Sequence, residues 1–455
     1  MYLVDLLPIL MFVALGVLLF TGIPVGFILG GVGLGFGVIG YFYGVFSPVE
    51  LFNINSRIYG SVADNLILTA IPMFIFMGTL LERSGIGDDL LRCLQVLLRR
   101  VPGGLALSVT LMGTIMAATT GIVGATVVML TLLALPVMLQ RKYSPALATG
   151  TIAASGTLGI LIPPSIMLVL MGDLLVVPVG TLFVAAIFPG LVLSGLYCLY
   201  ICMLAAWRPH LAPPIGVHEG PKTRTEWWGL MLKSFLPPTF LIAIVLGSIG
   251  FGWATPTEAA GVGAVGAILL TALNGRLTYA TLKDVLERSM LTNAMLFLIF
   301  IGAMAFAYVF RSLGGDNLVT DFMARLKLSS WTILAIMMII VFALGFVLEW
   351  IEITLIVLPV FTPLLRLLDF GEHVAKAELL PWFAVLLAVN LQTSFLTPPF
   401  GITLFYMKGV APSIPMQALY RGIVPFVILQ LIGLALAMAF PELVLWLPRK
   451  VGFLS

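Results

Sequence analysis

An apolar segment broken by glycine and proline, residues 153–171, constrains this chain more than any other feature of its sequence. The segment is hydrophobic enough to lie within a lipid bilayer, but Gly156, Gly159 and the pair Pro163-Pro164 interrupt it. Proline has no amide hydrogen and disfavours helix at the residue before it, so a continuous helix is not expected here. Non-helical backbone at membrane depth is tolerated only where protein buries it or where it lines a cavity. The segment therefore predicts an internal site.

A second segment of the same kind occupies residues 390–407 and has its own Pro-Pro pair. Interrupted apolar segments in the two halves of a membrane chain are typical of the central binding site of a secondary transporter. We therefore predict two broken helices, over residues 145–172 and 379–407.

Composition places most of the chain in a membrane. Of the 455 residues, 61% are hydrophobic and only 9% are charged, whereas soluble domains carry about 25% charged residues. The net charge of +3 gives no indication of nucleic-acid binding. Walker, zinc-ligand and Ser/His/Asp patterns are absent from the sequence, so we expect neither an enzyme nor a bound cofactor. The sequence predicts an all-α, multi-pass protein surrounded by membrane lipids.

Two long apolar blocks, residues 104–139 and 331–365, are each interrupted near the centre. The interruption is Ala-Thr-Thr-Gly at residues 118–121 in the first block and lies near Gly345 in the second. Each half-block is shorter than the roughly 20 residues that a full membrane span needs. We therefore predict two re-entrant hairpins with their tips at these interruptions.

The two halves of the chain share landmarks in the same order. Six pairs of matching motifs, among them the two Pro-Pro pairs, are separated by 223 to 236 residues. Matches at nearly constant spacing indicate an internal repeat. We predict a first repeat over residues 1–206, a cytoplasmic linker over 207–233 and a second repeat over 234–455, with the first span at residues 5–21.

The distribution of lysine and arginine predicts the orientation. Five loops that would share one side of the membrane hold 15 of the 23 basic residues, which favours placing them in the cytoplasm. The two hairpins then enter from opposite sides, so the two repeats are expected to be inverted. These loops are residues 83–103, 140–144, 207–233, 274–288 and 408–421.

The hairpin tips and the broken helices together predict a cation site in each half. Unwound backbone frees carbonyl oxygens and threonine adds hydroxyl oxygens, and hard cations prefer oxygen ligands. The alternative is a set of ordinary glycine and proline kinks that neighbouring helices satisfy, but a symmetric pair favours function. The candidate cation ligands are Thr119, Thr120, Gly121, Gly156 and Pro163 in the first half, and Gly345, Thr393, Thr397 and Pro398 in the second.

Two acidic residues, Glu349 and Glu352, follow the second tip one helical turn apart. A charged carboxylate in lipid costs at least about 2.5 kcal/mol, so an acid at this depth indicates function. The alternative is that Trp350 marks the membrane surface and that both acids reach water. Glu258 is predicted instead to cap a helix that begins near Pro256.

At this point the motifs resemble a known family. Gly-Ile-Leu-Ile-Pro-Pro-Ser165, Thr-Pro-Thr-Glu-Ala-Ala260 and Leu-Thr-Pro-Pro-Phe-Gly401 are similar to the large membrane (permease) subunit of tripartite ATP-independent periplasmic (TRAP) transporters. The resemblance implies an inverted-repeat, elevator-type transporter of the bacterial inner membrane that imports an organic acid by sodium symport. It also implies two protein partners, a small four-helix membrane subunit and a periplasmic substrate-binding protein.

The chain departs from the usual family pattern at both tips. The first tip has threonines where family members often have serines, and the second has Glu349 and Glu352 where an aspartate and an uncharged residue are common. Together with the long connection over residues 207–233, the second departure resembles the branch assigned to monocarboxylate or aromatic acids. We expect two sodium ions, one per repeat. The candidate substrate-binding residues are Thr157, Ser165, Glu349, Asn390, Gln392 and Ser394, of which Thr157 and Ser394 are also candidates for the cation cage.

Two alternatives remain at this point. A stand-alone sodium- or proton-coupled dicarboxylate symporter would share the fold and would transport without a binding protein. An intramembrane enzyme or an assembly scaffold would not need the inverted repeat.

Overall fold

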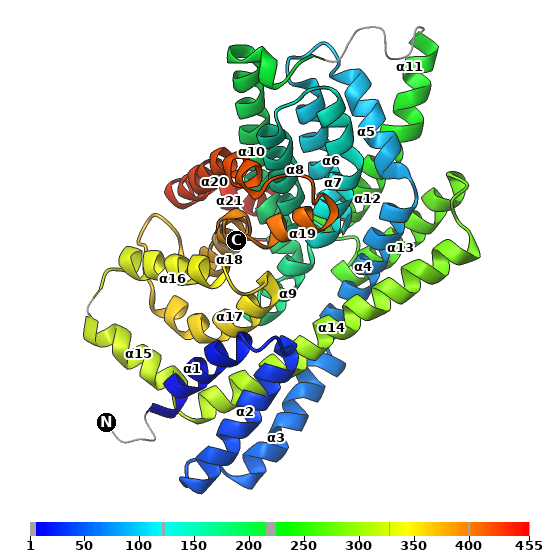
Figure 1. The fold of residues 1–455 in the computed structure, drawn as a ribbon. Helices are drawn as coiled ribbons and strands as arrows, with labels where there is room; N and C mark the ends of the chain where they lie inside the picture. Colours follow the sequence, from blue (N-terminus) through cyan, green and yellow to red (C-terminus); the bar gives the residue numbers. More distant parts are fainter. Residues whose placement is uncertain (1–5, 121–122, 215–223, 327, 399–400, 455) are drawn as a thin grey trace.

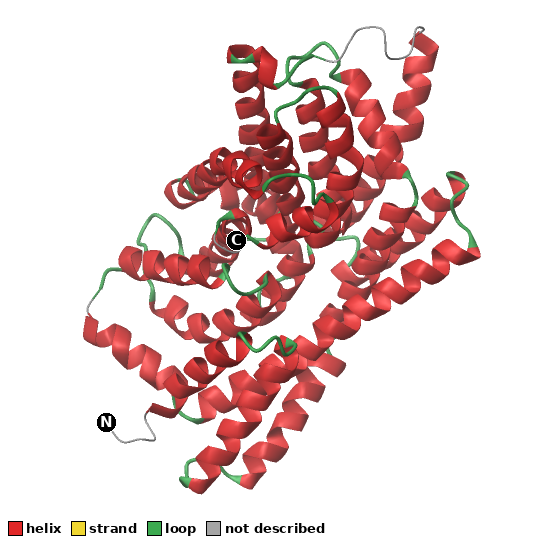
Figure 2. Ribbon diagram, viewed as in Figure 1, coloured by secondary structure: helices red, strands yellow, loops and turns green. Residues whose placement is uncertain are grey.

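The computed structural model describes residues 6–120, 123–214, 224–326, 328–398 and 401–454. Within these ranges the chain forms helices, turns and loops without a β-strand (Figure 2). Ten of the described helices are long and apolar enough to cross a membrane. The predicted all-α, polytopic fold is therefore confirmed.

The first helices form an arm at one end of the molecule (Figure 1). Helix α1 has 13 residues and is shorter than the full span expected at residues 5–21, because the chain turns at Gly22, where φ is +79°. The arm and the helices that follow it are α1 (Leu7–Leu19), α2 (Val25–Phe42), α3 (Pro48–Ile58), η2 (Tyr59–Ala63), η3 (Leu66–Thr69), α4 (Ala70–Arg83) and α5 (Ile86–Leu97).

A pair of helices and an interrupted helix come next, as the sequence predicts. Between η4 and α9 the chain is non-helical around Pro163-Pro164, and this break is buried apart from the partly exposed Ile162. The elements are α6 (Gly104–Thr120), α7 (Val123–Gln140), α8 (Pro145–Thr157), η4 (Leu158–Ile160), α9 (Ile166–Leu175) and α10 (Val179–Trp207).

Helix formation begins earlier than expected in the middle of the chain. Residues 207–233 are predicted to be a polar linker, but α11 already starts at Arg224 and continues through a π-helix into α12, because Trp227, Trp228 and Leu230 extend the apolar sequence. The elements are η5 (Pro209–Leu211), α11 (Arg224–Leu230), η6 (Met231–Phe235), α12 (Leu236–Gly250), α13 (Pro256–Leu273), α14 (Tyr279–Ser312) and α15 (Gly315–Leu326).

The end of the chain repeats the order of a helix pair followed by an interrupted helix. Helix α18 is the most enclosed of the candidate spans in the described chain, with 94% of its apolar window buried. The elements are α16 (Ser330–Leu344), α17 (Trp350–Leu367), η7 (Lys376–Glu378), α18 (Leu379–Leu396), α19 (Ile402–Val410), α20 (Met416–Ala439) and α21 (Glu442–Val451).

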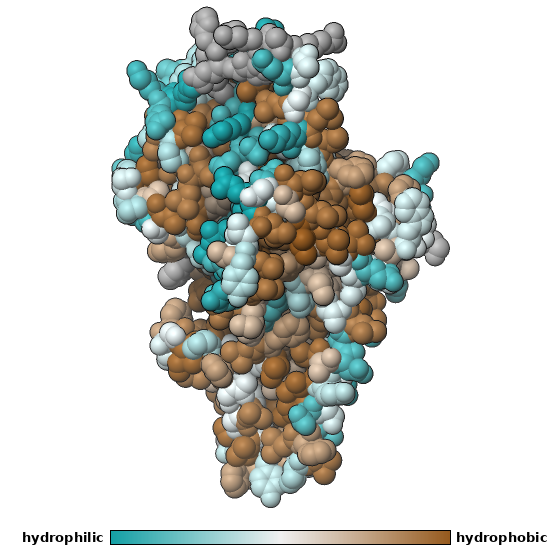
Figure 3. Space-filling model, turned by 90° about the vertical axis from the view of Figure 1, so that its right-hand side faces the viewer, coloured by the Kyte–Doolittle hydropathy of each residue, from teal (hydrophilic) through white to brown (hydrophobic). Residues whose placement is uncertain are grey.

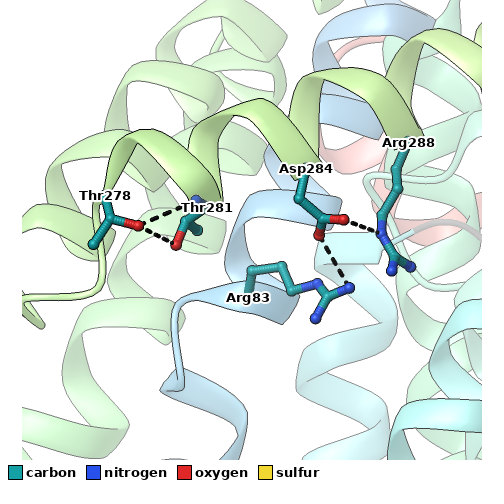
Figure 4. Close-up of polar contacts among 5 residues, drawn as sticks. All are labelled: Arg83, Thr278, Thr281, Asp284 and Arg288. Carbon is teal, nitrogen blue, oxygen red and sulfur yellow. Dashed lines mark hydrogen bonds and ion pairs between the residues drawn. The ribbon is translucent and has the colours of Figure 1, made fainter.

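Helix α14 is the long diagonal helix of Figure 1, with α2 beside one part of it and α4 beside another. Its 34 residues give a length of about 51 Å, against about 30 Å for the hydrocarbon core of a bilayer. Arg83, at the end of α4, reaches Asp284 near the start of α14 at 3.0 Å (Figure 4). This partly exposed ion pair joins the two helix ends.

Two local features show how the sequence fixes helix positions. Glu258 Oε2 accepts a hydrogen bond from the Thr255 amide at 2.8 Å, which confirms the predicted cap of α13. Helices α8 and α20 cross at Gly150 and Gly422, where a Cβ added to Gly150 would lie 2.1 Å from the Gly422 carbonyl oxygen. The two backbones therefore touch at this crossing.

Candidate functional site

A cavity of about 510 Å³ lies where five parts of the chain meet. Its walls come from the α1–α2 connection, the middle of α14, the beginning of α7, the turn between α16 and α17, and the beginning of α19 together with Phe395 of α18. These segments are far apart in the sequence, and the cavity is lined mainly by apolar side chains.

Four helices begin at the wall of this cavity. They are α2 at Val25, α7 at Val123, α17 at Trp350 and α19 at Ile402, and all four residues line the cavity. The first turn of a helix carries free N–H groups and partial positive charge, so it attracts anions. Among the described lining residues there is no lysine, arginine or histidine. Because Glu349 and Glu352 already cap the start of α17, the starts of α2, α7 and α19 are the positive groups that the cavity wall offers.

The polar side of the cavity is formed around Glu349. Tyr406 donates its hydroxyl hydrogen to Glu349 Oε1 at 2.8 Å, and the Glu349 amide donates to Glu352 Oε2 at 2.8 Å. Glu352 therefore satisfies a backbone group at the start of α17. Trp350 is 5% exposed and Glu352 is 7% exposed, so both pack inside the protein, whereas Glu349 is half-buried in the cavity wall.

Helix α19 also connects the cavity to the first hairpin. The ring of Tyr406 covers Gly124 at the start of α7, where an added Cβ would lie 2.9 Å from Tyr406 Cε2. Thr403, one turn before Tyr406, is fully buried, and its hydroxyl has no hydrogen-bond partner in the described chain. A bound molecule in the cavity could use this hydroxyl as donor or acceptor.

A separate buried polar cluster lies where α8, α10, α18 and α20 meet. Thr157 Oγ1 accepts hydrogen bonds from Gln392 Nε2 at 3.2 Å and from Gln430 Nε2 at 3.4 Å. Gln392 Nε2 also lies 3.5 Å from the Tyr197 hydroxyl. The structure brings the predicted residues Thr157 and Gln392 together, but neither of them lines the cavity.

The second hairpin packs directly on the second broken helix. Gly345 ends α16, and a Cβ added to it would lie 2.0 Å from Ser394 Oγ and 2.4 Å from Ser394 Cβ. Asn390, on the same helix as Ser394, donates its amide to the Met338 carbonyl of α16 at 2.7 Å. These predicted residues therefore hold the hairpin against α18.

The hydroxyl groups of the remaining candidate site residues form hydrogen bonds with nearby backbone carbonyls of their own segments. Thr393 donates to the Val389 carbonyl at 3.0 Å, Thr397 donates to the Thr393 carbonyl at 2.8 Å, and Ser165 donates to the Ile160 carbonyl. Each bond leaves the lone pairs of the hydroxyl oxygen free for another contact. The other predicted positions are Gly156 and Pro163, which are buried, Pro398, which is exposed, and Glu349, which is half-buried.

The first hairpin tip lies at the edge of the described chain. Gly121 is outside the described residues, and the side chains of Thr119 and Thr120, at the end of α6, are outside them as well. Their predicted role as cation ligands stays a prediction.

Sequence reasoning overlooked Tyr406, Thr403 and Gln430. Gln430 has a clear signal, since it is a polar residue inside the apolar span α20. Tyr406 and Thr403 lie in the second broken segment, but their place in the cavity depends on contacts with α7 and α17 that the sequence does not reveal.

The family model described as "Tripartite ATP-independent periplasmic transporter, DctM component" matches residues 12–443. The chain belongs to this family. Among its relatives, the C4-dicarboxylate TRAP transporter large permease protein DctM of Pseudomonas aeruginosa is 30% identical over 414 residues, covering 90% of this chain and 92% of the relative. The sialic acid TRAP transporter large permease protein SiaM of Vibrio cholerae is 28% identical, covering 95% of this chain and 96% of the relative.

Solved structures share the fold of the permease. The YdaH transporter of Alcanivorax borkumensis aligns with a TM-score of 0.61 at 16% identity, over 89% of this chain and 90% of that one. MtrF of Neisseria gonorrhoeae aligns with a TM-score of 0.53 at 14% identity, over 86% and 83% of the two chains. The protein is thus a multi-pass inner-membrane transporter permease and not an enzyme.

Proposed function

We propose that this permease imports an organic acid by sodium symport, that a periplasmic binding protein delivers the acid, and that a small four-helix membrane subunit completes the transporter. The observation that carries the proposal is the cavity, with four helix starts and a Tyr406–Glu349 pair in its wall. Relatives named for C4-dicarboxylate, sialic acid and 2,3-diketo-L-gulonate support an acidic substrate.

The charges in the cavity support cation coupling. Glu349 and Glu352 line it together with no basic side chain among the described residues. A carboxylate substrate would add negative charge beside these acids, and like charges at short range repel each other strongly where little water screens them. A cation that enters with the acid offsets this repulsion. Each positive charge that enters also gains about 2.3 kcal/mol per 100 mV of membrane potential.

The proposed cation ligands lie at the two hairpin tips and the two breaks. One proposed site contains Gly345, Thr393 and Thr397 of the second half. The other contains the buried residues Gly156 and Pro163, together with Thr119, Thr120 and Gly121 of the first tip. In the elevator movement we propose, the hairpins and broken helices move as a transport group relative to α2 and α14, and the cavity lies between these two groups.

The proposal is tested by uptake into proteoliposomes that contain the permease and its small subunit. We expect accumulation of a radiolabelled organic acid when an inward sodium gradient and the loaded binding protein are both present. Replacing sodium by choline, or omitting the binding protein, should abolish it. Uptake without the binding protein would identify a stand-alone symporter instead, and uptake driven equally by a proton gradient would refute sodium coupling.

A further inference from the structure

An outward-facing groove runs between α12 and α13. It has a volume of about 490 Å³ and is lined by Leu236 to Ile244 of α12 and by Gly266 to Leu273 of α13. Several of its large apolar side chains are open, from Ile244 at 39% exposed to Leu273 at 82%. The candidate spans that contain α12 and α13 are also the least buried of those found in the described chain, at 22% and 33%.

The shape of the groove suits a single hydrocarbon chain. At its floor the Leu241 side chain packs against Gly266, where an added Cβ would lie 2.3 Å from Leu241 Cδ1, so the two helices approach each other closely. A helix with its side chains is about 10 Å wide and would rest on the rim of a furrow between two adjacent helices. An acyl chain is narrow and flexible enough to lie inside it. Figure 3 faces the right-hand side of Figure 1, toward which α13 lies, and shows broad apolar areas beside bands of hydrophilic residues.

One end of the groove carries positive charge. Lys233 lies in η6, three residues before Leu236, and Arg276 lies three residues after Leu273, in the turn that follows the end of α13. Because the start of α12 faces the end of α13, both basic residues are at the same end. Both are exposed, and neither has a salt bridge or a side-chain hydrogen bond with another residue of the described chain.

A nearby acidic group does not neutralise this end. Asp284, in the first turns of α14 just after Arg276, is already held by Arg83 at 3.0 Å and by Arg288 at 3.0 Å (Figure 4). Glu82 lies beside the same two arginines, so these four groups balance one another, and the positive charge at this end of the groove comes from Lys233 and Arg276. Basic side chains at the end of a membrane helix extend to the headgroup level, where phosphate is the abundant anion.

We propose that this groove binds one anionic phospholipid, with an acyl chain along α12 and α13 and the phosphate between Lys233 and Arg276. The site is independent of the transport cavity, since the two share no lining residue. It would hold this side of the permease at a fixed depth in the membrane.

Native mass spectrometry of the purified full-length permease in mixed phosphatidylglycerol and phosphatidylcholine tests the proposal. We expect one phosphatidylglycerol to be retained with a preference of about tenfold, and the exposed double variant K233Q/R276Q to lose that preference. The double variant K376Q/K450Q removes two exposed charges elsewhere and should keep it. Equal retention of both lipids by the unaltered permease, or an unchanged preference in K233Q/R276Q, would overturn the proposal.

A photoactivatable phosphatidylglycerol locates the site. Labelled peptides should come from residues 236–244 and 266–273, and labelling confined to other helices would refute this location. The same experiment in the assembled transporter shows whether a lipid or a protein partner occupies the groove. A Phe240→Cys variant that cross-links to the small subunit or to a second copy, together with loss of lipid labelling, would assign the groove to a protein partner.

Discussion

The Thr157 hydroxyl accepts a hydrogen bond from the Gln392 amide at 3.2 Å, and these residues are 235 positions apart, the spacing that also separates Pro163 from Pro398. In the repeat that we propose, Thr157 and Gln392 therefore occupy equivalent positions and contact each other directly. Both are buried, and Gln430 of α20 joins them. The contact makes the stability of one broken helix depend on the other.

Replacing Thr157 with valine should destabilise the permease. Valine keeps the shape but removes the acceptor that Gln392 and Gln430 share, and a buried donor left without a partner costs about 1–3 kcal/mol. Thermal unfolding in detergent measures the loss. The matched control is Thr149→Val on the same helix, because Thr149 donates only to carbonyls of its own helix and should cost about 1 kcal/mol or less. Equal losses in the two variants would contradict the prediction.

Replacing Gly345 with alanine should reduce transport at least about tenfold, because the added methyl group would occupy the space of Ser394 and push the hairpin away from α18. Removing the Ser394 side chain makes room, so G345A/S394G should recover most of the activity. Gly195→Ala is the control, since nothing lies within 4 Å of a Cβ there. Uptake assays on all three variants test this packing, and failure of the double variant to recover would count against it.

Replacing Tyr406 with phenylalanine should raise the KM for the acid or for sodium about tenfold. The change removes a hydrogen bond to a carboxylate, which contributes about 1.5–3 kcal/mol, and leaves Glu349 without that donor in the cavity wall. Initial rates of uptake at varied acid and sodium concentrations give the two KM values. Tyr420→Phe serves as control, because Tyr420 lies outside the cavity. Unchanged KM values for both solutes would exclude a role for the Tyr406 hydroxyl in binding.

Replacing Arg449 with glutamine should destabilise the end of the chain. Arg449 binds Glu378 through two hydrogen bonds of 2.6 Å, which raise the pKa of its guanidinium above the ordinary value, and the Glu378 side chain is only 8% exposed. Leaving that carboxylate unpaired should cost about 1.5–3 kcal/mol of unfolding free energy. Glu442→Gln removes the other, largely exposed partner of Arg449 and should cost about 0–1 kcal/mol. Thermal unfolding should rank the two variants in this order.

Sodium itself should stabilise the purified permease. A ligand that binds only the folded state raises its stability by RT ln(1 + [L]/Kd), so the melting temperature should rise with sodium at constant ionic strength. Potassium and choline should give no comparable rise. Alanine at Thr397 or at Thr119 should weaken the effect. A flat response in all three salts would argue against sodium sites and for proton coupling through Glu349.

The sequence predicts the parts of this fold whose cause is local. Pro163-Pro164 interrupts a helix because proline lacks an amide hydrogen, and Thr255 with Glu258 caps α13 because their side chains reach neighbouring amides. The start of α14 at Tyr279, in polar sequence, is harder to predict. Thr278 caps the start of this helix, and Asp284 forms an ion pair with Arg288, which lies one helical turn later. These two contacts stabilise the helix through its polar first turns.

The candidate site is harder to predict than the fold, because its walls come from helices remote in sequence. Glu349 is recognisable as an acid in an apolar block. Tyr406 and Thr403 acquire their place only when α19 packs against α7 and the second hairpin, and such tertiary packing leaves no periodicity or motif in the chain. Thr157 and Gln392 are recognisable as polar residues in the broken segments, but they belong to the separate buried polar cluster and not to the cavity.

The crossing of α8 and α20 at Gly150 and Gly422 sets a limit on how the permease can move. With no side chain between the backbones, neither helix has room to slide or roll over the other without a clash of main-chain atoms. A displacement that carries the first broken helix must therefore carry α20 as well. In the elevator movement that we propose, the sliding surface would have to pass outside this pair, so α20 would move with the transport group although it lines no part of the cavity.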